Sequence, residues 1–294
     1  MLWAVFTLIA AAAQTARNAM QRELTAALGT VGATHVRFLF GFPFALVFLA
    51  CVLTVTGTAL PSPPLVFWPW VLAGAFSQIA ATATMLSVMG QRSFVVAYAY
   101  IKTEPVHVAL FGLVFLGDKI SAFSALAILI ATAGVIVISP RAKPGEGGAV
   151  RSTVVGLVSG ALFGLSAIGY RGAILSLQLP NFVVAATFTV TVGLIIQAAV
   201  LSLYLALRDP KVLRAIARAW RPSLFAGFMG AFASEFWFLA FAITTAANVR
   251  TLALVEVLFA QGVTRFVFKQ PTTQRELVGI GLVVIGVGLL IWAH

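Results

Sequence analysis

Charged residues are scarce in this chain of 294 residues, of which Asp, Glu, Lys and Arg make up only 9%. Soluble domains carry about 25% charged residues and are about half apolar. The 61% of hydrophobic residues found here therefore excludes an ordinary water-soluble globular protein. The mean hydropathy of +1.04 indicates instead a chain that lies mostly in lipid.

Cysteine is almost absent as well, because Cys51 is the only one. A single cysteine excludes an intramolecular disulfide, and the histidines (His35, His107 and His294) are too scattered to predict a metal site with it. No HExxH, GxSxG or phosphate-binding-loop pattern occurs. We therefore predict no metal, no cofactor and no enzyme, and keep an integral-membrane enzyme acting on a lipid as a less favoured alternative.

Acidic residues are also few, at 8 against 19 basic ones, and the formal net charge is +11. In a soluble chain this excess would indicate nucleic-acid binding, but here the Lys and Arg residues cluster between apolar runs. Such clusters face the cytoplasm and anionic lipid, so we expect no nucleic-acid partner. The basic segment 208–221 has apolar residues at helical spacing, which predicts either a helix along the inner membrane surface or a solvated loop.

Long apolar runs make up most of the chain. They cover residues 2–20, 31–56, 66–89, 93–116, 120–139, 153–173, 182–207, 223–244, 247–268 and 275–293. Each is long enough to cross about 30 Å of hydrocarbon as a helix. The alternation of barrel strands is absent, and the first run lacks the basic start of a signal peptide. The sequence therefore predicts an all-α integral membrane protein with ten transmembrane helices.

A short linker divides these runs into two sets of five. Residues 140–152 have linker composition and separate a first unit, 1–139, from a second unit, 153–294. A shift of 152 residues (256 minus 104) places Glu104 on Glu256, which indicates an internal repeat. Because five is odd, the second unit starts on the other side of the membrane, and the two five-helix repeats are predicted to be inverted.

The positions of the basic residues predict the orientation. Most Lys and Arg residues lie in the loops after the odd-numbered runs, which places those loops in the cytoplasm. We therefore expect a multi-pass protein of the cell inner membrane with both termini on the periplasmic side.

Two carboxylates, Glu104 and Glu256, lie near the middle of their runs. An ionisable side chain at membrane depth costs roughly 2.5 to 3.5 kcal/mol on insertion scales, so these are the leading functional candidates. Tyr100, Glu104 and His107 share one predicted helix face. Pro105 predicts a hinge that exposes polar backbone to a cavity. In the alternative, structural interpretation, each Glu pairs with a Lys or Arg of a neighbouring helix.

Five further side chains complete the predicted substrate cavity. Glu235 and Trp237 combine a carboxylate with an aromatic ring, which suits a substrate ammonium group. Lys102 and Arg250 are the candidates for a substrate carboxylate, although for Arg250 pairing with a Glu is slightly favoured. Gln78 adds hydrogen-bonding capacity, and bonding between helices is its favoured role.

Other arginines and the glycines are interpreted as structural. Arg17, Arg37 and Arg171 lie near the ends of their runs, where their side chains are expected to anchor the helices or snorkel to the membrane surface. Small residues let helices approach closely in lipid. This is expected of the glycines in the sixth and tenth runs, which are Gly156, Gly160, Gly164, Gly279, Gly281, Gly286 and Gly288.

Several positions match the pattern of a known family. They are Arg37, Pro105, the run Leu116-Gly117-Asp118-Lys119, and the pairs Gly134-Val135 and Gly286-Val287. On these residues the chain resembles the EamA-type ten-helix exporters of the drug/metabolite transporter (DMT) superfamily and, among them, YddG-type amino-acid exporters. The resemblance implies a central cavity formed by helices 1, 3, 4, 6, 8 and 9, and export of small metabolites by alternating access. Asp118, Val257 and Lys269-Gln270 depart from the family pattern.

The predicted function is thus that of an inner-membrane secondary transporter that exports amino acids, with an aromatic or apolar bias, and related small metabolites. We expect a monomer whose partners are the small-molecule substrate and membrane lipid. A cationic-drug or nucleotide-sugar carrier of the same fold is the alternative. Glu104, Glu256 and His107 allow coupling to protons, whereas facilitated diffusion requires no titrating residue.

Overall fold

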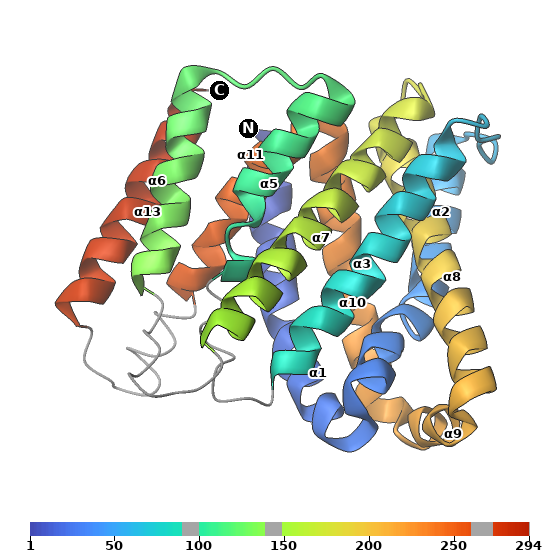
Figure 1. Ribbon diagram of the computed structural model, residues 1–294. Coiled ribbons are helices and arrows are strands. Elements are labelled where there is room, and N and C mark those ends of the chain that lie inside the picture. The colour runs from blue at the N-terminus through green and yellow to red at the C-terminus, as the bar shows by residue number, and fades with distance from the viewer. Residues whose placement is uncertain (90–99, 139–148, 260–272, 294) are drawn as a thin grey trace.

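The structure is a computed structural model that describes residues 1–89, 100–138, 149–259 and 273–293, and all regular secondary structure in these ranges is helical. The helices are α1 (Leu2–Leu39), α2 (Phe42–Thr56), α3 (Phe67–Met89), α5 (Glu104–Phe111), α6 (Ala122–Ile138), α7 (Ala149–Ser176), α8 (Phe182–Arg208), α9 (Pro210–Arg218), α10 (Trp220–Ile243), α11 (Ala246–Leu252) and α13 (Gln274–Trp292). The π-helical segment η1 (Gly112–Leu116) follows α5, and the 3₁₀ segment η2 (Ala253–Val255) follows α11. Most helices run side by side in one bundle, while α9 lies across its lower end (Figure 1).

Six helical stretches are long and apolar enough to cross a membrane. They are Ala27–Thr56, Phe67–Ser87, Thr153–Ser176, Phe182–Arg208, Trp220–Ile243 and Gln274–Trp292. Shorter apolar helices cover Leu2–Arg17, Glu104–Leu116 and Ala122–Ile138. The protein is therefore an α-helical membrane protein, and the number of ten spans stays a prediction. The predicted linker at 140–152 lies largely outside the described residues, and its last four residues already belong to α7.

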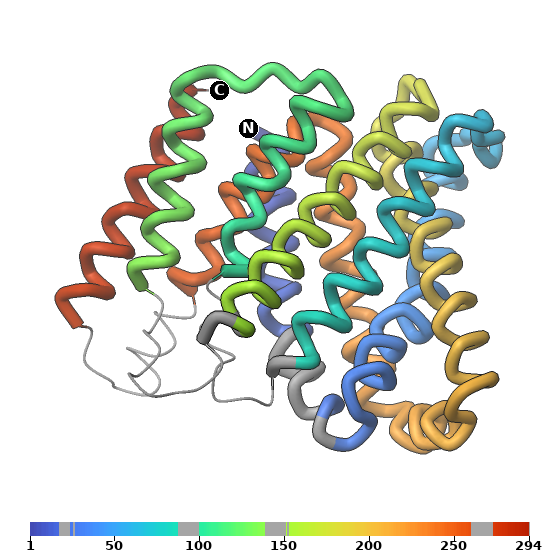
Figure 2. Tube along the Cα trace, in the orientation of Figure 1, coloured from blue at the N-terminus to red at the C-terminus, as the bar shows by residue number. Residues whose placement is uncertain are grey.

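The first predicted run and the beginning of the second form one helix, α1, with a sharp turn inside it. Gly29 has φ 68° and ψ 177°, a conformation that glycine adopts without a steric penalty. α1 passes down through the bundle, turns back at the lower end and leads into α2 (Figure 2). The run 31–56, expected as a single helix, is interrupted at Phe40 and Gly41, just before Pro43. Proline suits the first turn of α2 because its missing N–H has no partner there.

The two segments that carry the deep carboxylates are both interrupted. α5 begins at Glu104, after a turn at Lys102 and Thr103, so the break lies beside Pro105, where the sequence predicts it. α11 gives way to the 3₁₀ segment η2 immediately before Glu256. Such short changes of helix type often mark a hinge. Both carboxylates therefore lie next to irregular points of the backbone.

The basic segment 208–221 contains a helix, so the prediction of a solvated loop is wrong. The side chain of Asp209 caps the start of α9 by accepting a hydrogen bond from a backbone N–H in its first turn. Ile216 is buried, and Val212 and Leu213 pack against an apolar cluster that includes residues of α1 and α8. The apolar side of α9 therefore packs on the bundle.

Three helix pairs make the most extensive contacts: α1 with α10, α3 with α7, and α6 with α13. The last pair lies at one edge of the bundle (Figure 1). A Cβ atom added at Gly134 of α6 would lie 2.7 Å from the backbone nitrogen of Val283, and Gly286 approaches α6 as closely. Gly281 and Gly288 have no such neighbour within 4 Å. The predicted close packing therefore involves only part of the glycine set in this helix.

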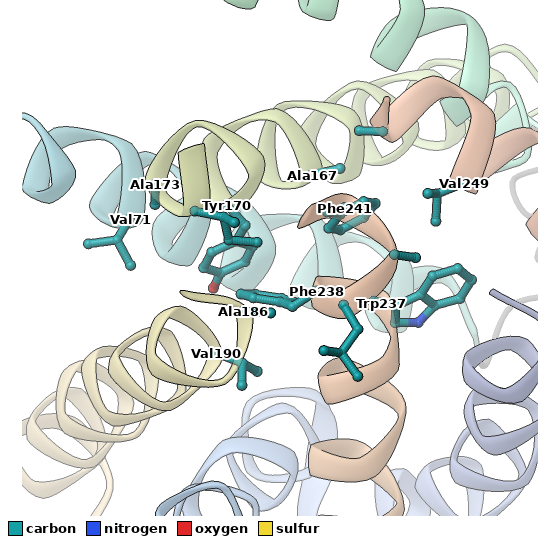
Figure 3. Close-up of a cluster of buried hydrophobic side chains, with 14 of the residues drawn as sticks. Val71, Ala167, Tyr170, Ala173, Ala186, Val190, Trp237, Phe238, Phe241 and Val249 are labelled. Carbon is teal, nitrogen blue, oxygen red and sulfur yellow. The ribbon is translucent and has the colours of Figure 1, made fainter. Parts of the chain in front are cut away.

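An apolar core fixes α10 against α7 and α8. The rings of Tyr170 and Phe238 lie 4.6 Å apart, centre to centre, and both side chains are buried. Figure 3 shows this pair between the helices, with Phe241 and Trp237, which also belong to α10, on the side of Val249. The core thereby holds Trp237 at its edge, where the polar centre of the protein begins.

Candidate functional site

A small polar cavity lies among α1, α3, α5, α7, α10 and α11. Its volume is about 40 Å³, and it is lined by Gln14, Arg17, Arg37, Gln78, Met85, Ile101, Lys102, Glu104, Phe163, Trp237 and Arg250. An adjoining cavity of about 20 Å³ is lined by Gln14, Lys102, Glu104, Pro105, Arg250, Ala253, Leu254 and Glu256. One water molecule needs about 10–15 Å³, so the first cavity holds only a few waters.

Six of the nine side chains predicted to form the cavity come together here. Gln78, Lys102, Glu104, Trp237 and Arg250 line the larger cavity, and Glu256 lines the smaller one. They come from segments far apart in the sequence, so the bundle, and not local spacing, assembles the site.

The deep carboxylates form two ion pairs that cross between the interrupted segments. Arg250 Nε lies 2.9 Å from Glu104 Oε1, and Lys102 Nζ pairs with Glu256 Oε1. Each segment thus contributes a cation to one ion pair and a carboxylate to the other. Both contacts are ion pairs between largely buried side chains. This is the structural arrangement that the sequence left open as the alternative to a substrate site.

Gln14 connects the ion pairs to the aromatic wall, although the sequence analysis did not single it out. Its Oε1 accepts a hydrogen bond of 3.1 Å from Trp237 Nε1, and its Nε2 donates over 3.5 Å to Glu256 Oε2. The Arg250 guanidinium carbon lies 4.7 Å from the centre of the Trp237 ring. The ring that was predicted to face a substrate ammonium is therefore partly covered by the protein's own arginine. An amide in the middle of an apolar run was the available signal for Gln14.

Two arginines predicted to reach the membrane surface point inward instead. Arg17 and Arg37 are only 4% and 5% exposed, and both line the cavity. A Cβ atom at Gly230 of α10 would lie 3.3 Å from Arg37 Cγ and 3.5 Å from Arg17 Cδ. The turn at Gly29 folds the two halves of α1 back on each other, which brings both side chains to α10. The prediction of snorkelling is wrong because it used the distance of each residue from the end of its apolar run.

Gln78 has the bonding role that the sequence favoured. Its Oε1 accepts hydrogen bonds from Gln197 Nε2 at 2.8 Å and from the Tyr170 hydroxyl at 3.3 Å. It therefore links α3 to α7 and α8 while its side chain also lines the cavity.

Tyr100, His107 and Glu235 do not line either cavity. A turn at Lys102 and Thr103 interrupts the predicted helix between Tyr100 and the α5 residues Glu104 and His107. His107 Nδ1 lies 3.2 Å from the Thr103 carbonyl oxygen, within its own segment.

Glu235 lies on α10 but away from the cavity. It is 8% exposed and accepts a hydrogen bond from the Thr187 hydroxyl of α8. Its predicted role beside Trp237 is therefore not supported by its position, because residues two apart on a helix point to different sides.

Arg171 also differs from its predicted role as a helix anchor. It is 9% exposed, and its Nη1 donates hydrogen bonds to the carbonyl oxygens of Phe241, at 2.6 Å, and Thr244. Its Nη2 lies 3.3 Å from Asp118 Oδ1. Arg171 thus joins α7 and the end of α10 to the loop after η1. This loop carries the Gly117-Asp118 pair on which the family resemblance partly rests.

The walls of the two cavities carry more positive than negative charge. Four cationic side chains, those of Arg17, Arg37, Lys102 and Arg250, face two carboxylates, those of Glu104 and Glu256. These groups offer ion pairing and hydrogen bonds to a ligand. Within the residues that the structure describes, no three His, Cys, Asp or Glu side chains gather to hold a metal ion.

Comparison with known proteins bears on the fold. No protein-family model and no curated protein matches the chain. A solved structure described as "Crystal structure of protein" superposes with a TM-score of 0.74 and 14% sequence identity. The match covers 99% of this chain and 95% of that chain. The shared architecture therefore extends over nearly the whole length of both proteins, and the likeness concerns the fold alone.

Proposed function

We propose that the protein is an inner-membrane secondary transporter that exports amino acids and related small metabolites by alternating access. The observation that carries this proposal is the meeting of two interrupted membrane segments at one buried, charged cavity. Transporters commonly place the substrate site at broken helices near the middle of the membrane. Buried ionisable residues are expensive in lipid, so six charged side chains around two adjoining cavities favour a functional over a purely structural centre.

The proposal includes ten spans arranged as two inverted repeats, of the kind found in EamA-type exporters. The helix contacts support it: exchanging the two halves would turn the α1–α10 pair into the α7–α3 pair and leave the α6–α13 pair unchanged. The crossed ion pairs have the same symmetry, since Glu104 and Glu256 each pair with a cation from the other segment. Both observations fit a pseudo-twofold axis through the cavity.

The proposed orientation places both termini in the periplasm. The termini lie at one end of the bundle, and α9 lies at the other (Figure 1). The segment around α9 carries Arg208, Lys211, Arg214, Arg218 and Arg221, and such clusters favour the cytoplasmic side.

In this structure the protein is closed around the central cavity. Pockets for small molecules usually measure about 300–1,000 Å³, far more than the cavity of about 40 Å³. We therefore propose that substrate enters when the interrupted segments move apart, with Pro105 and η2 at the hinges.

Transport into liposomes tests the proposal. Purified protein is reconstituted, and counterflow is measured over a panel of amino acids, nucleotide sugars and cationic dyes. We expect amino acids with apolar or aromatic side chains to exchange, and Glu104→Gln and Trp237→Ala each to lower the flux. Unchanged flux and substrate ranking in both variants would refute the assignment, and exchange of dyes or nucleotide sugars alone would favour the other carriers of this fold. Flux that ignores an imposed pH gradient would exclude proton coupling.

A further inference from the structure

Arg37 is a buried cation without an anionic partner among the residues that the structure describes. Only 5% of the residue is exposed, and its side chain lines the larger cavity. Within the described part of the chain it has no hydrogen bond or ion pair, and its Nε is buried without an acceptor. Its guanidinium carbon lies 5.2 Å from the centre of the Phe38 ring.

The carboxylates of the cavity are already engaged by other cations. Glu104 pairs with Arg250, and Glu256 pairs with Lys102. Each of these two ion pairs is neutral overall. Neither carboxylate is therefore available to balance the positive charge of the Arg37 guanidinium. A buried charge without a partner is strongly unfavourable, which makes the cavity receptive to an anion.

The geometry of arginine indicates which anion fits. The planar guanidinium presents its N–H donors as a fork that matches the two oxygens of a carboxylate or a phosphate. Met85, Ile101 and Phe163 form an apolar wall in the same cavity. A molecule with an anionic group at one end and an apolar group at the other is therefore complementary to both sides.

We propose that Arg37 binds the anionic group, a carboxylate or a phosphate, of the transported molecule. This inference rests on the proposed function and deepens it. It moves the anion site from Lys102 and Arg250, which the sequence suggested, to a residue that the sequence assigned to the membrane surface. It also predicts that the cavity discriminates against a simple amine, which has no group for Arg37.

Four ligands that share one phenyl ring test the proposal: L-phenylalanine, 3-phenylpropionate, phenyl phosphate and 2-phenylethylamine. Binding to the detergent-purified protein is measured by calorimetry, and exchange is measured by counterflow in liposomes. We expect the amine to bind least. A hydrogen-bonded charge pair is worth a factor of about 10 to 100 in affinity, so Arg37→Gln is expected to weaken the preferred anionic ligands by that factor.

Two further variants complete the design. Arg37→Lys keeps the charge but loses the fork, and we expect intermediate affinity. Arg218→Gln on the exposed side of α9 removes one arginine far from the cavity and is expected to bind all four ligands as the wild type does. If Arg37→Gln does not fold, Arg37→Lys and the ligand ranking of the wild type carry the test.

The outcomes separate the inference from the function on which it rests. A loss confined to the carboxylates, or to the phosphate, supports the inference and identifies the anionic group. Exchange of L-phenylalanine that is unaffected by Arg37→Gln, or binding of the amine as tight as that of the amino acid, overturns the inference but leaves transport in place. Failure of the wild type to bind or exchange any of the four ligands overturns both.

Discussion

The ion pair between Glu104 and Arg250 allows a sharp test of how the centre is stabilised. The two side chains are 14% and 10% exposed, and Nε lies 2.9 Å from Oε1. We consider three variants: Glu104→Gln, Arg250→Gln and the double variant. Each replaces a charged group by a neutral amide that still fills much of the space.

The expected changes in the free energy of unfolding follow from the burial of the pair and from the surplus of positive charge around the cavity. Removing one partner of a buried ion pair costs about 3–5 kcal/mol, against about 1 kcal/mol or less at the surface. With roughly a tenth of each side chain exposed, we expect Glu104→Gln to lower the free energy of unfolding by about 3 kcal/mol. Arg250→Gln should cost less, because Glu104 keeps Lys102 close by in the cavity wall. The double variant removes both charges and should be no less stable than Glu104→Gln alone.

Unfolding in mixed micelles, followed by far-ultraviolet circular dichroism, measures these differences. The two single variants and the double variant form a thermodynamic cycle whose coupling energy we expect to be on the order of 2 kcal/mol. Arg218→Gln, which removes an exposed charge, is the matched control and should change stability by less than about 0.5 kcal/mol. If the effects of the two substitutions simply add, the pair is not coupled, and the ionic account of the centre is wrong.

Two other predictions concern helix packing and the hinge. Gly134→Ala brings a methyl group against the backbone of α13 and should destabilise the protein by about 1–3 kcal/mol. Gly281→Ala meets open space and should be neutral or slightly stabilising. Equal effects of the two substitutions in an unfolding titration would refute this packing account. Pro105→Ala should leave the stability within about 0.5 kcal/mol, because proline in a first turn gives up no bond, but should change the rate of counterflow if the turn is a hinge. An unchanged rate would remove Pro105 from the mechanism.

Much of the fold follows from the sequence, because the apolar runs have the length and composition that lipid demands. The helices α3, α8, α10 and α13 agree with their predicted runs within a few residues. The break beside Glu104 could also be predicted, since Pro105 removes a backbone donor there. Apolarity alone did not predict the turns and breaks that lie within the long helical segments. Gly29 allows a turn within continuous helix, and the run 31–56 divides at Phe40 and Gly41.

The site was harder to predict because its contacts join distant segments. The depth of Glu104 and Glu256 indicated their importance, but their partners depended on how α5 and α11 face each other. Position within an apolar run was misleading for Arg37, since an arginine near the end of a run usually reaches the surface. The turn in α1 directs Arg37 toward the cavity. The residues next to Arg37 in the sequence do not reveal this, because the turn lies eight residues earlier.

Charge balance links these features to the proposed transport cycle. In the proposed cycle, opening the cavity would separate α5 from α11 and would pull Glu104 from Arg250 and Glu256 from Lys102, because each pair joins the two segments. Every charge released in this way must find water or ligand, since an unpaired charge at membrane depth is unfavourable. A zwitterionic substrate meets that requirement at both ends: its ammonium group can take the place of a cation beside a released Glu, and its carboxylate can pair with Arg37. The same ion pairs that hold the empty site closed would thus make its opening depend on a ligand that carries both charges.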